Sequence, residues 1–281
     1  MNDDPAILLL IFNRPALTFK IFEYIKTIKP LRLYIGADGP RAGVESDIQK
    51  CEETRKICSE INWNCEVKLL YRNDNLGCGR AVSSAITWFF ENEEQGIILE
   101  DDCLPNEYFY NYCKNLLAYY KNDNRIMHIG GTNFQKGKTY GSASYYFSAI
   151  PHVWGWATWG RAWKHYDFNL SDLNFFLNRN VIKKYVGSGK THDFWFEIFC
   201  KMNQKKIDTW DYQWQYAIWN YNGLAIIPQV NLVQNIGFGI DATHTTDNNP
   251  YGEMRTYPLI EIIHPDLISQ CVEADKNFFE I

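Results

Sequence analysis

The stretch Gly96-Ile97-Ile98-Leu99-Glu100-Asp101-Asp102 joins a short apolar run directly to three consecutive acidic residues. The apolar run is typical of a strand buried inside a sheet. Three carboxylates at the end of such a strand repel one another and lose hydration, and both effects are costly. A hard divalent cation such as Mg²⁺ or Mn²⁺ would offset these costs, because carboxylate oxygens are its preferred ligands. A solvated acidic turn after the strand is the alternative interpretation.

Upstream of this stretch, apolar runs alternate with segments of helical periodicity. We expect strands over residues 7–12, 31–36, 67–71 and 96–99. We expect helices over residues 15–28 and 47–60, and another that follows the loop 72–80 and runs to residue 90. Asn13 is expected to cap the first helix and Pro15 to occupy its first turn. Strands and helices in alternation predict an α/β fold with a parallel sheet and helices on both faces.

The predicted strand ends carry groups that suit a ligand site. Ligands of parallel sheets bind outside the carboxyl ends of the strands. In this chain those ends hold Asn13-Arg14, Asp38, Arg72 with Asn75, and Glu100-Asp101-Asp102. Such a set offers partners for a base, for phosphates and for a metal ion, so we expect one site at this edge. The Gly-rich loops lack the spacing of a P-loop or of a dinucleotide-binding turn, which excludes both classes.

After the acidic residues the pattern is less regular. We expect helices over 107–120, between 173 and 203, and near 266–279, and a further helix that follows the stretch 208–214 and ends near residue 220. We expect strands over 126–130, 145–149, 224–228 and 231–234. Residues 151–160 combine glycines with indoles and are expected to form a loop. There Gly155 would let the backbone approach a ligand and Trp156 would exclude water. A packed connection is the alternative, because Trp is usually well buried.

Composition limits the classes of protein that fit. With 281 residues, 46% of them hydrophobic, the chain can form one large α/β domain. A net charge of −5 argues against a surface that binds nucleic acid. No stretch is long enough to span a membrane, and the N-terminal apolar run is too short for a signal peptide. The 8 cysteines include no Cys-x-x-Cys pair and fit a reducing compartment. We therefore expect a cytoplasmic protein, and peripheral contact with the inner face of the membrane stays open.

The order of these features resembles the nucleotide-sugar glycosyltransferases of the GT-A fold. Within them it is most similar to the group around N-acetylglucosaminyltransferase I and its bacterial relatives in surface-polysaccharide synthesis. The features lie between residues 7 and 244 and comprise the segment 7–15, Asp38, the loop 72–80, the Glu-Asp-Asp triplet, the Trp-Gly-Trp loop and Trp210-Asp211. The resemblance implies one GT-A domain with a Rossmann-like, mixed and mainly parallel sheet and a C-terminal acceptor-side subregion. Its parts would be a nucleotide-sugar-binding half over 1–135, an acceptor and catalytic half over 136–247 and a tail over 248–281.

The resemblance also implies roles for single residues. Donor-binding residues would be Asn13, Arg14, Asp38, Arg72, Arg80, Glu100, Asp101, Gly155 and Trp156. Asp102 would bind the Mn²⁺ or Mg²⁺ ion that bridges the diphosphate, and His244 would be a further metal ligand. Asp211 would be the catalytic base that takes the proton from the acceptor hydroxyl, which a positioned carboxylate can do. Taken alone, Asp211 also fits the cap of a helix, and His244 also fits an ordinary loop histidine.

The implied activity is a metal-dependent, inverting transfer of a sugar from a UDP-sugar, such as one resembling UDP-GlcNAc, to a glycan or glycolipid acceptor. The pathway would be surface polysaccharide or lipooligosaccharide synthesis. Two alternatives remain at this point. The tryptophans also suit a carbohydrate-binding protein without catalysis. A sugar nucleotidyltransferase would share the α/β half, but it needs a Gly-rich basic loop after the first strand, where this chain has Asn13-Arg14-Pro15.

Overall fold

The N-terminal part of the fold is a parallel sheet built from alternating strands and helices. The computed structural model describes residues 4–238 and 254–280. The strands are β1 (Ala6–Ile11), β2 (Arg32–Ala37), β3 (Glu66–Tyr71) and β4 (Gln95–Glu100), and the helices that connect them are α1 (Pro15–Ile28), α2 (Glu45–Ile57) and α3 (Gly77–Phe90). β1 pairs in parallel with β2 and with β4, and β2 pairs in parallel with β3. The predicted alternation is therefore confirmed, with boundaries that differ by a few residues.

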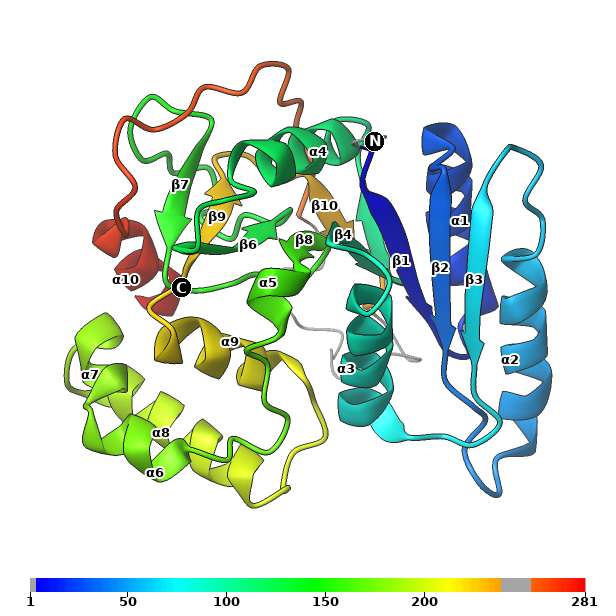
Figure 1. The fold of residues 1–281 in the computed structure, drawn as a ribbon, viewed down its shortest axis with the longest axis horizontal. Coiled ribbons are helices and arrows are strands. Elements are labelled where there is room, and N and C mark those ends of the chain that lie inside the picture. The colour runs from blue at the N-terminus through cyan, green and yellow to red at the C-terminus, as the bar shows by residue number, and fades with distance from the viewer. Residues whose placement is uncertain (1–3, 239–253, 281) are drawn as a thin grey trace.

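The rest of the main sheet is mixed. Its further strands are β6 (Ile126–Gly130), β7 (Tyr145–Ser148), β8 (Trp156–Trp159) and β9 (Leu224–Pro228). The strand order is β3-β2-β1-β4-β8-β6-β9-β7, and β8 runs antiparallel to both of its neighbours. A separate small sheet pairs β5 (Cys103–Pro105) with β10 (Val233–Asn235) in antiparallel orientation. The expected α/β class with a mixed sheet and flanking helices is thus present (Figure 1).

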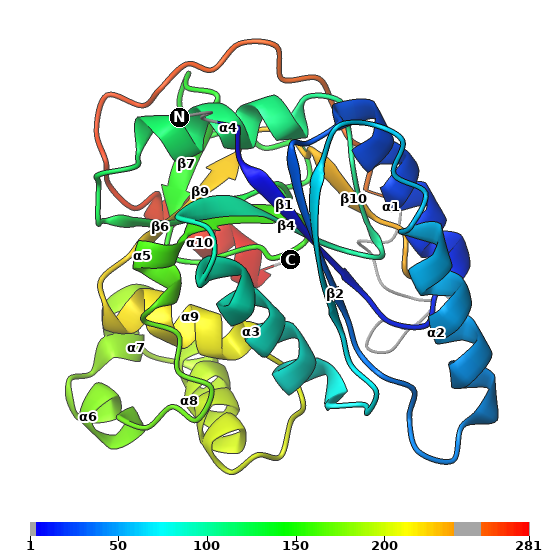
Figure 2. The same ribbon diagram turned by 45° about the vertical axis from the view of Figure 1, so that its right-hand side comes forward.

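Each face of the main sheet has its own hydrophobic core. Side chains of β1 alternate between the two faces, as they do in any strand. Ile7 and Leu9 pack with α1 and with α4 (Phe109–Tyr119), whereas Leu8 and Leu10 pack with α3 and the later helices. Figure 2 shows α1 and α2 on one side of this part of the sheet and α3 on the other.

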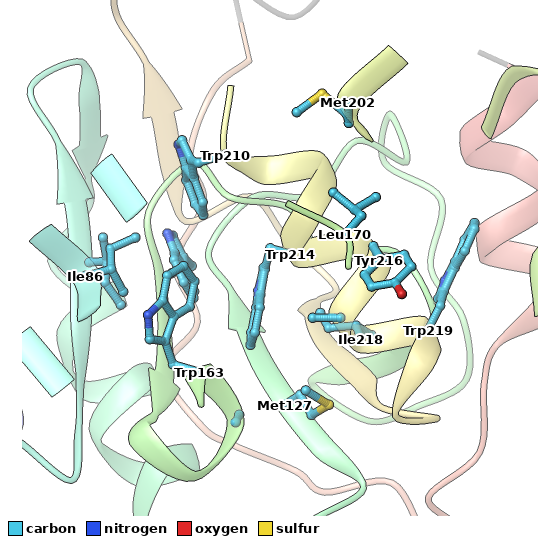
Figure 3. Close-up of a cluster of buried hydrophobic side chains, with 14 of the residues drawn as sticks. Ile86, Met127, Trp163, Leu170, Met202, Trp210, Trp214, Tyr216, Ile218 and Trp219 are labelled. Carbon is cyan, nitrogen blue, oxygen red and sulfur yellow. The ribbon is translucent and has the colours of Figure 1, made fainter. Parts of the chain in front are cut away.

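The second core is rich in indole rings. It lies between the sheet and the helices α5 (Gly160–Trp163), α6 (Leu173–Asn178), α7 (Val181–Val186), α8 (Lys190–Asn203) and α9 (Asp211–Asn220). Figure 3 shows Trp163, Trp210 and Trp214 close together in this core, with Ile86 of α3 nearby. The ring centroids of Trp163 and Trp214 are 5.2 Å apart, and those of Trp163 and Trp210 are 6.4 Å apart. These tryptophans are core residues, so they are not platforms for a sugar at the surface.

The expectation of a loop over residues 151–160 is wrong for its second half. Trp156–Trp159 form β8, which lies between β4 and β6 in the sheet. Trp156 faces the indole-rich core, while the Nε1–H of Trp159 donates to the carbonyl of Leu117 on the other side, at 3.1 Å. Burial of two large rings on opposite faces favours a strand at this position more than the neighbouring glycines favour a turn.

The remaining helices match their predictions in order. α6, α7 and α8 occupy the region between residues 173 and 203, and α9 ends at Asn220 as expected. The tail helix α10 (Val272–Glu280) is shorter than the predicted 266–279. No helix within the described residues combines the length and the apolar character that a membrane span requires.

Candidate functional site

The carboxyl ends of β1, β2 and β4 lie at one edge of the sheet. The register pairs Leu10 with Glu100 and Ile11 with Ala37, so the residues that follow these strands emerge together. Arg14, at the N-cap position of α1, reaches the acidic triplet from this edge. Its Nη1 donates to Asp102 Oδ2 at 3.0 Å, and its Nη2 forms an ion pair with Asp101. The structure thus brings together three predicted site residues from two strand ends.

Burial controls the charge of the triplet. Glu100 lies half-buried at the end of β4, and burial is the largest cause that raises the pKa of its carboxyl. The neighbouring carboxylates Asp102 and Asp101 raise it further, and Arg14 opposes them. Burial also raises the pKa of Asp101, which is 3% exposed, and Arg14 is the strongest influence in the other direction. Arg14 is therefore the counter-charge on which the ionised form of the triplet depends.

Asp102 is engaged on both sides of its carboxylate. Oδ2 accepts from Arg14, and Oδ1 accepts a weak hydrogen bond from the Cys103 thiol, with an Sγ–O distance of 3.3 Å. The segment after β10 passes directly over this residue. The Ile236 amide donates to the Asp102 carbonyl at 2.7 Å, and a Cβ at Gly237 would lie 2.4 Å from Oδ2. Only glycine therefore fits beside this carboxylate.

The donor set of the triplet suits a hard divalent cation, since it consists of neighbouring carboxylates. Within the described residues, however, no group of three or more His, Cys, Asp and Glu side chains is arranged to hold a metal ion. A cation bound at Asp102 Oδ2 would take over the place of the Arg14 guanidinium. His244, the second predicted metal ligand, lies outside the described residues, and its role stays a prediction.

Asp38 organises the loop that precedes α3. Its carboxylate accepts from the Leu76 amide at 3.0 Å and from Asn75 Nδ2 at 2.9 Å. Burial raises the pKa of Asp38, and the hydrogen bond from the Leu76 amide is the strongest influence that lowers it. Nearby, Arg55 Nη2 donates to the carbonyls of Asp38 and Arg72, at 3.1 and 2.6 Å. The second strand end and the predicted donor loop are therefore one connected unit.

The two predicted arginines of this loop contact other parts of the chain. Arg72 Nη2 donates to Ser84 Oγ on α3 at 2.8 Å, and burial lowers the pKa of its guanidinium while Asp38 opposes this. The guanidinium of Arg80 lies over the ring of Phe168, 4.8 Å from its centroid. Contact of either arginine with a donor stays a prediction.

Asn13 does not cap α1, contrary to the expectation. Its Nδ2 donates to Asp47 Oδ1 at 2.7 Å, and Arg41 Nε donates to Asp47 Oδ2 at 2.6 Å. The carboxylate of Asp47 is 1% exposed, so it requires these partners. The hydrogen bond with Arg41 is the main cause that lowers the pKa of Asp47 to about 2. The predicted position of Pro15 in the first turn is confirmed.

Gly155 and Trp156 serve the packing of the protein. Gly155 has φ +64°, and a Cβ there would lie 2.8 Å from Val233 Cγ2 on β10. Trp156 is 0% exposed, and its ring stacks on His128 and Trp210, with centroids 5.0 and 5.5 Å away. Trp156 is therefore a core residue, and its predicted role in donor binding stays a prediction. Contact between a donor and the backbone of Gly155 stays a prediction.

Asp211 approaches the triplet from the other half of the chain. It is the first residue of α9, half-buried, and Thr209 Oγ1 donates to its Oδ1 at 2.5 Å. Its charge contributes to the raised pKa of Glu100 and of the Cys78 thiol. The N-cap position of α9 belongs to Trp210, whose side chain makes no capping hydrogen bond. Sequence reasoning named Asp211 as a candidate base, which stays a prediction, and missed its neighbour Asp208, whose carboxylate accepts two amides of α3.

Together these features define an α/β protein with an acidic, arginine-paired site at the carboxyl edge of its sheet. No protein-family model matches the chain, and no curated protein matches it. Among solved structures it is similar to HddC from Yersinia pseudotuberculosis, with 13% identity over 60% of this chain and 85% of that chain and a TM-score of 0.35. It is also similar to CMP:2-keto-3-deoxy-manno-octonic acid synthetase complexed with CTP, with 11% identity, 72% and 99% of the two chains covered and a TM-score of 0.36. UDP-glucose pyrophosphorylase complexed with UDP-glucose matches with 10% identity, 52% and 62% coverage and a TM-score of 0.29.

Proposed function

We propose that this protein is a transferase of nucleotide-activated sugars, and more narrowly a glycosyltransferase that uses a UDP-sugar and a glycan or glycolipid acceptor. The observation that carries the proposal is the pairing of Arg14 with the acidic triplet at one edge of the sheet. The charge of Asp211, from the other half of the chain, also acts on the pKa of Glu100. This edge is where α/β sheets bind nucleotides and related ligands. A cationic group beside carboxylates, with a separate carboxylate from the other half of the chain, suits transfer from a diphosphate.

In this proposal, Arg14, Asp102 and Asp38 would bind different parts of the donor. Arg14 would turn toward a bound diphosphate, since its guanidinium suits phosphate oxygens as well as carboxylates. A divalent cation held by Asp102, when bound, would neutralise the charge that develops on the leaving diphosphate. Asp38 and the loop that it organises would border the nucleotide. These assignments follow the resemblance described above, and the contacts of Arg14 and Asp38 are compatible with them.

Asp211 is the best candidate for the base. A single displacement at the anomeric carbon requires one group that accepts the proton of the attacking hydroxyl. Asp211 is half-buried and accepts a hydrogen bond from Thr209 with Oδ1. Its second oxygen has no hydrogen-bond partner among the described residues and would accept from an acceptor hydroxyl. It carries its charge close to the triplet, as its influence on the pKa of Glu100 indicates.

A sugar nucleotidyltransferase is the second candidate. It requires a phosphate-binding loop between the first strand and the first helix. Here β1 ends at Ile11 and α1 begins at Pro15, which leaves only Phe12, Asn13 and Arg14 between them. This short connection favours glycosyl transfer. A carbohydrate-binding protein without catalysis is less favoured, because Trp156, Trp159, Trp214 and Trp219 are fully buried.

One panel of reactions tests both candidates. Purified protein is incubated with UDP-sugars, with and without Mn²⁺, and the release of UDP is measured. In parallel, nucleoside triphosphates are offered with sugar 1-phosphates and the release of pyrophosphate is measured. We expect slow UDP release from at least one UDP-sugar, and its loss in Asp211→Asn or Asp102→Asn. Pyrophosphate release without UDP release would support the second candidate and reject the first.

A further inference from the structure

Helix α3 receives its N-terminal cap from a residue far away in the chain. The carboxylate of Asp208 accepts the Cys78 amide with Oδ2 and the Gly79 amide with Oδ1, both at 2.9 Å. Asp208 and Cys78 are 130 residues apart. Leu76, at the N-cap position of α3, provides no capping side chain. The first amides of a helix need acceptors, and here the acceptor is supplied by the segment that leads into α9.

The glycines at the start of α3 fit this carboxylate closely. A Cβ at Gly77 would lie 2.5 Å from Asp208 Oδ2, and Gly77 has φ +78°, which favours glycine. A Cβ at Gly79 would lie 2.7 Å from the Thr209 carbonyl oxygen and 2.9 Å from Asp208 Oδ1. A larger residue at Gly77 would displace the Asp208 carboxylate, and one at Gly79 would push against the Thr209 backbone. The Gly-Cys-Gly sequence therefore serves this contact, in addition to the turn.

The same segment carries the proposed base. Thr209 follows Asp208 and donates its hydroxyl to Asp211. The Thr209 carbonyl accepts Gln213 Nε2 at 3.1 Å, and the Trp210 carbonyl accepts the Tyr166 hydroxyl at 3.1 Å. Asp211 is thus attached on one side to α9 and on the other, through Asp208, to α3.

The start of α3 is also connected to the strand-end site. Asp38, which follows β2, accepts a hydrogen bond from the Leu76 amide, and the Cys78 amide two residues later donates to Asp208. Two carboxylates from opposite halves of the molecule therefore accept amides of the same turn, that of Leu76 and those of Cys78 and Gly79. A shift of this turn would move the loop that borders the proposed donor and the segment that carries Asp211 together.

We infer that Asp208 is a positioning residue for the reaction: it fixes the segment that carries Asp211 to the donor half of the molecule. The inference rests on the proposed function for its catalytic part. Within the described residues, the contacts of Asp208 are the two amides and the glycines described above, and it forms no hydrogen bond with the acidic triplet or with a group proposed to react. If Asp208 only capped α3, its substitution would lower the stability of the protein and leave kcat unchanged. If it positions Asp211, its substitution also lowers kcat.

The test compares Asp208→Ala and Asp208→Asn with a matched control. Asp167 is the control, because its carboxylate also accepts two backbone amides, Asn169 at 2.9 Å and Ser171 at 2.6 Å, but only within its own turn. Thermal unfolding, the dissociation constant of UDP, and kcat and KM for UDP release are measured for each variant. Amide hydrogen exchange is followed at residues 78–79 and 210–213.

We expect Asp208→Ala to exchange faster at both sets of amides, to bind UDP within about twofold of wild type and to lose about 10- to 100-fold in kcat, the range for a misplaced catalytic group. Asp208→Asn keeps one acceptor oxygen, so its exchange rates and its kcat should lie between those of wild type and Asp208→Ala. Asp167→Ala should lower the melting temperature but keep kcat. An Asp208→Ala variant with kcat within twofold of wild type would overturn the inference. If wild type releases no UDP from any donor, the proposed function fails, and unchanged exchange at 210–213 in Asp208→Ala would then refute the positioning role separately.

Discussion

Removal of the Arg14 guanidinium should cost a large part of the stability of the fold. Arg14→Met keeps the length of the side chain but leaves Asp101 without its counter-charge. The side chain of Asp101 is 4% exposed and that of Arg14 is 19% exposed, so the pair is largely shielded from water. Loss of one partner of a buried ion pair costs about 3–5 kcal/mol. Because Asp101 can bind a proton instead, we expect a loss near the lower end, about 3 kcal/mol at neutral pH.

The loss should depend on pH in a defined direction. In wild type, Arg14 opposes the rise that burial causes in the pKa of Asp101. Without Arg14 this pKa rises further above the unfolded value of 3.8. A carboxyl with a raised folded pKa contributes stability at low pH and loses it as the pH rises through that pKa. The deficit of Arg14→Met should therefore be larger at pH 8 than at pH 5.

Urea unfolding followed by circular dichroism measures these differences. The double variant Arg14→Met/Asp101→Asn should recover most of the loss, because no unpaired charge remains buried. Arg41→Met is the matched control: it removes the arginine partner of the buried Asp47, which keeps its hydrogen bond from Asn13. We expect this control to cost less than Arg14→Met, about 1–2 kcal/mol, because the Arg41 side chain is 53% exposed and solvent weakens its contact with Asp47. A loss below about 1 kcal/mol in Arg14→Met, or no recovery in the double variant, would refute Arg14 as the counter-charge of the triplet.

Three further predictions address the site and the core. Asp102→Asn should abolish any Mn²⁺-dependent rise of the melting temperature in the presence of UDP, and an unchanged rise would remove Asp102 from the metal site. Asp211→Asn should bind UDP like wild type but transfer sugar at least about 100-fold more slowly, as expected for loss of a general base; normal turnover would reject the assignment. His128 and His152 are fully buried, and burial lowers the pKa of each to about 3. Such groups stabilise the fold above their unfolded pKa of 6.5, and this stability is lost as the pH falls from 6.5 toward 3. Each histidine contributes up to about 1.4 kcal/mol of stability per pH unit in that window. Between pH 7 and 5, the free energy of unfolding measured with urea should therefore decline less steeply in His128→Gln than in wild type. Equal slopes would contradict this.

The parallel half of the fold could be predicted from the sequence because its signals are local. β1, β2 and β4 are mainly apolar runs bounded by turn residues, and helices of regular periodicity lie between the strands. The alternation itself implies that Arg14, Asp38 and the acidic triplet emerge at one edge. Local patterns do not reveal which distant side chain meets which group. Asn13 has the local chemistry of a cap, but the buried carboxylate of Asp47 takes its amide. Asp208 looks like an ordinary loop residue until the fold brings it to α3.

The indole-rich core explains how Asp211 comes to lie near the triplet. β8 runs antiparallel to β4 and pairs Trp156 with Ile98, two residues before Glu100. Trp210 stacks on Trp156 at an interplanar angle of 19°, so the segment before α9 rests on β8 close to the carboxyl end of β4. Asp211 follows Trp210 directly and therefore projects from a position set by the stack. Since Asp208 fixes the other end of this short segment to α3, the proposed base is held between an apolar contact and a polar one. The stack of Trp210 on Trp156 is deeply buried, whereas Asp208 is exposed. A substitution of Asp208 can therefore weaken this arrangement without disrupting the core.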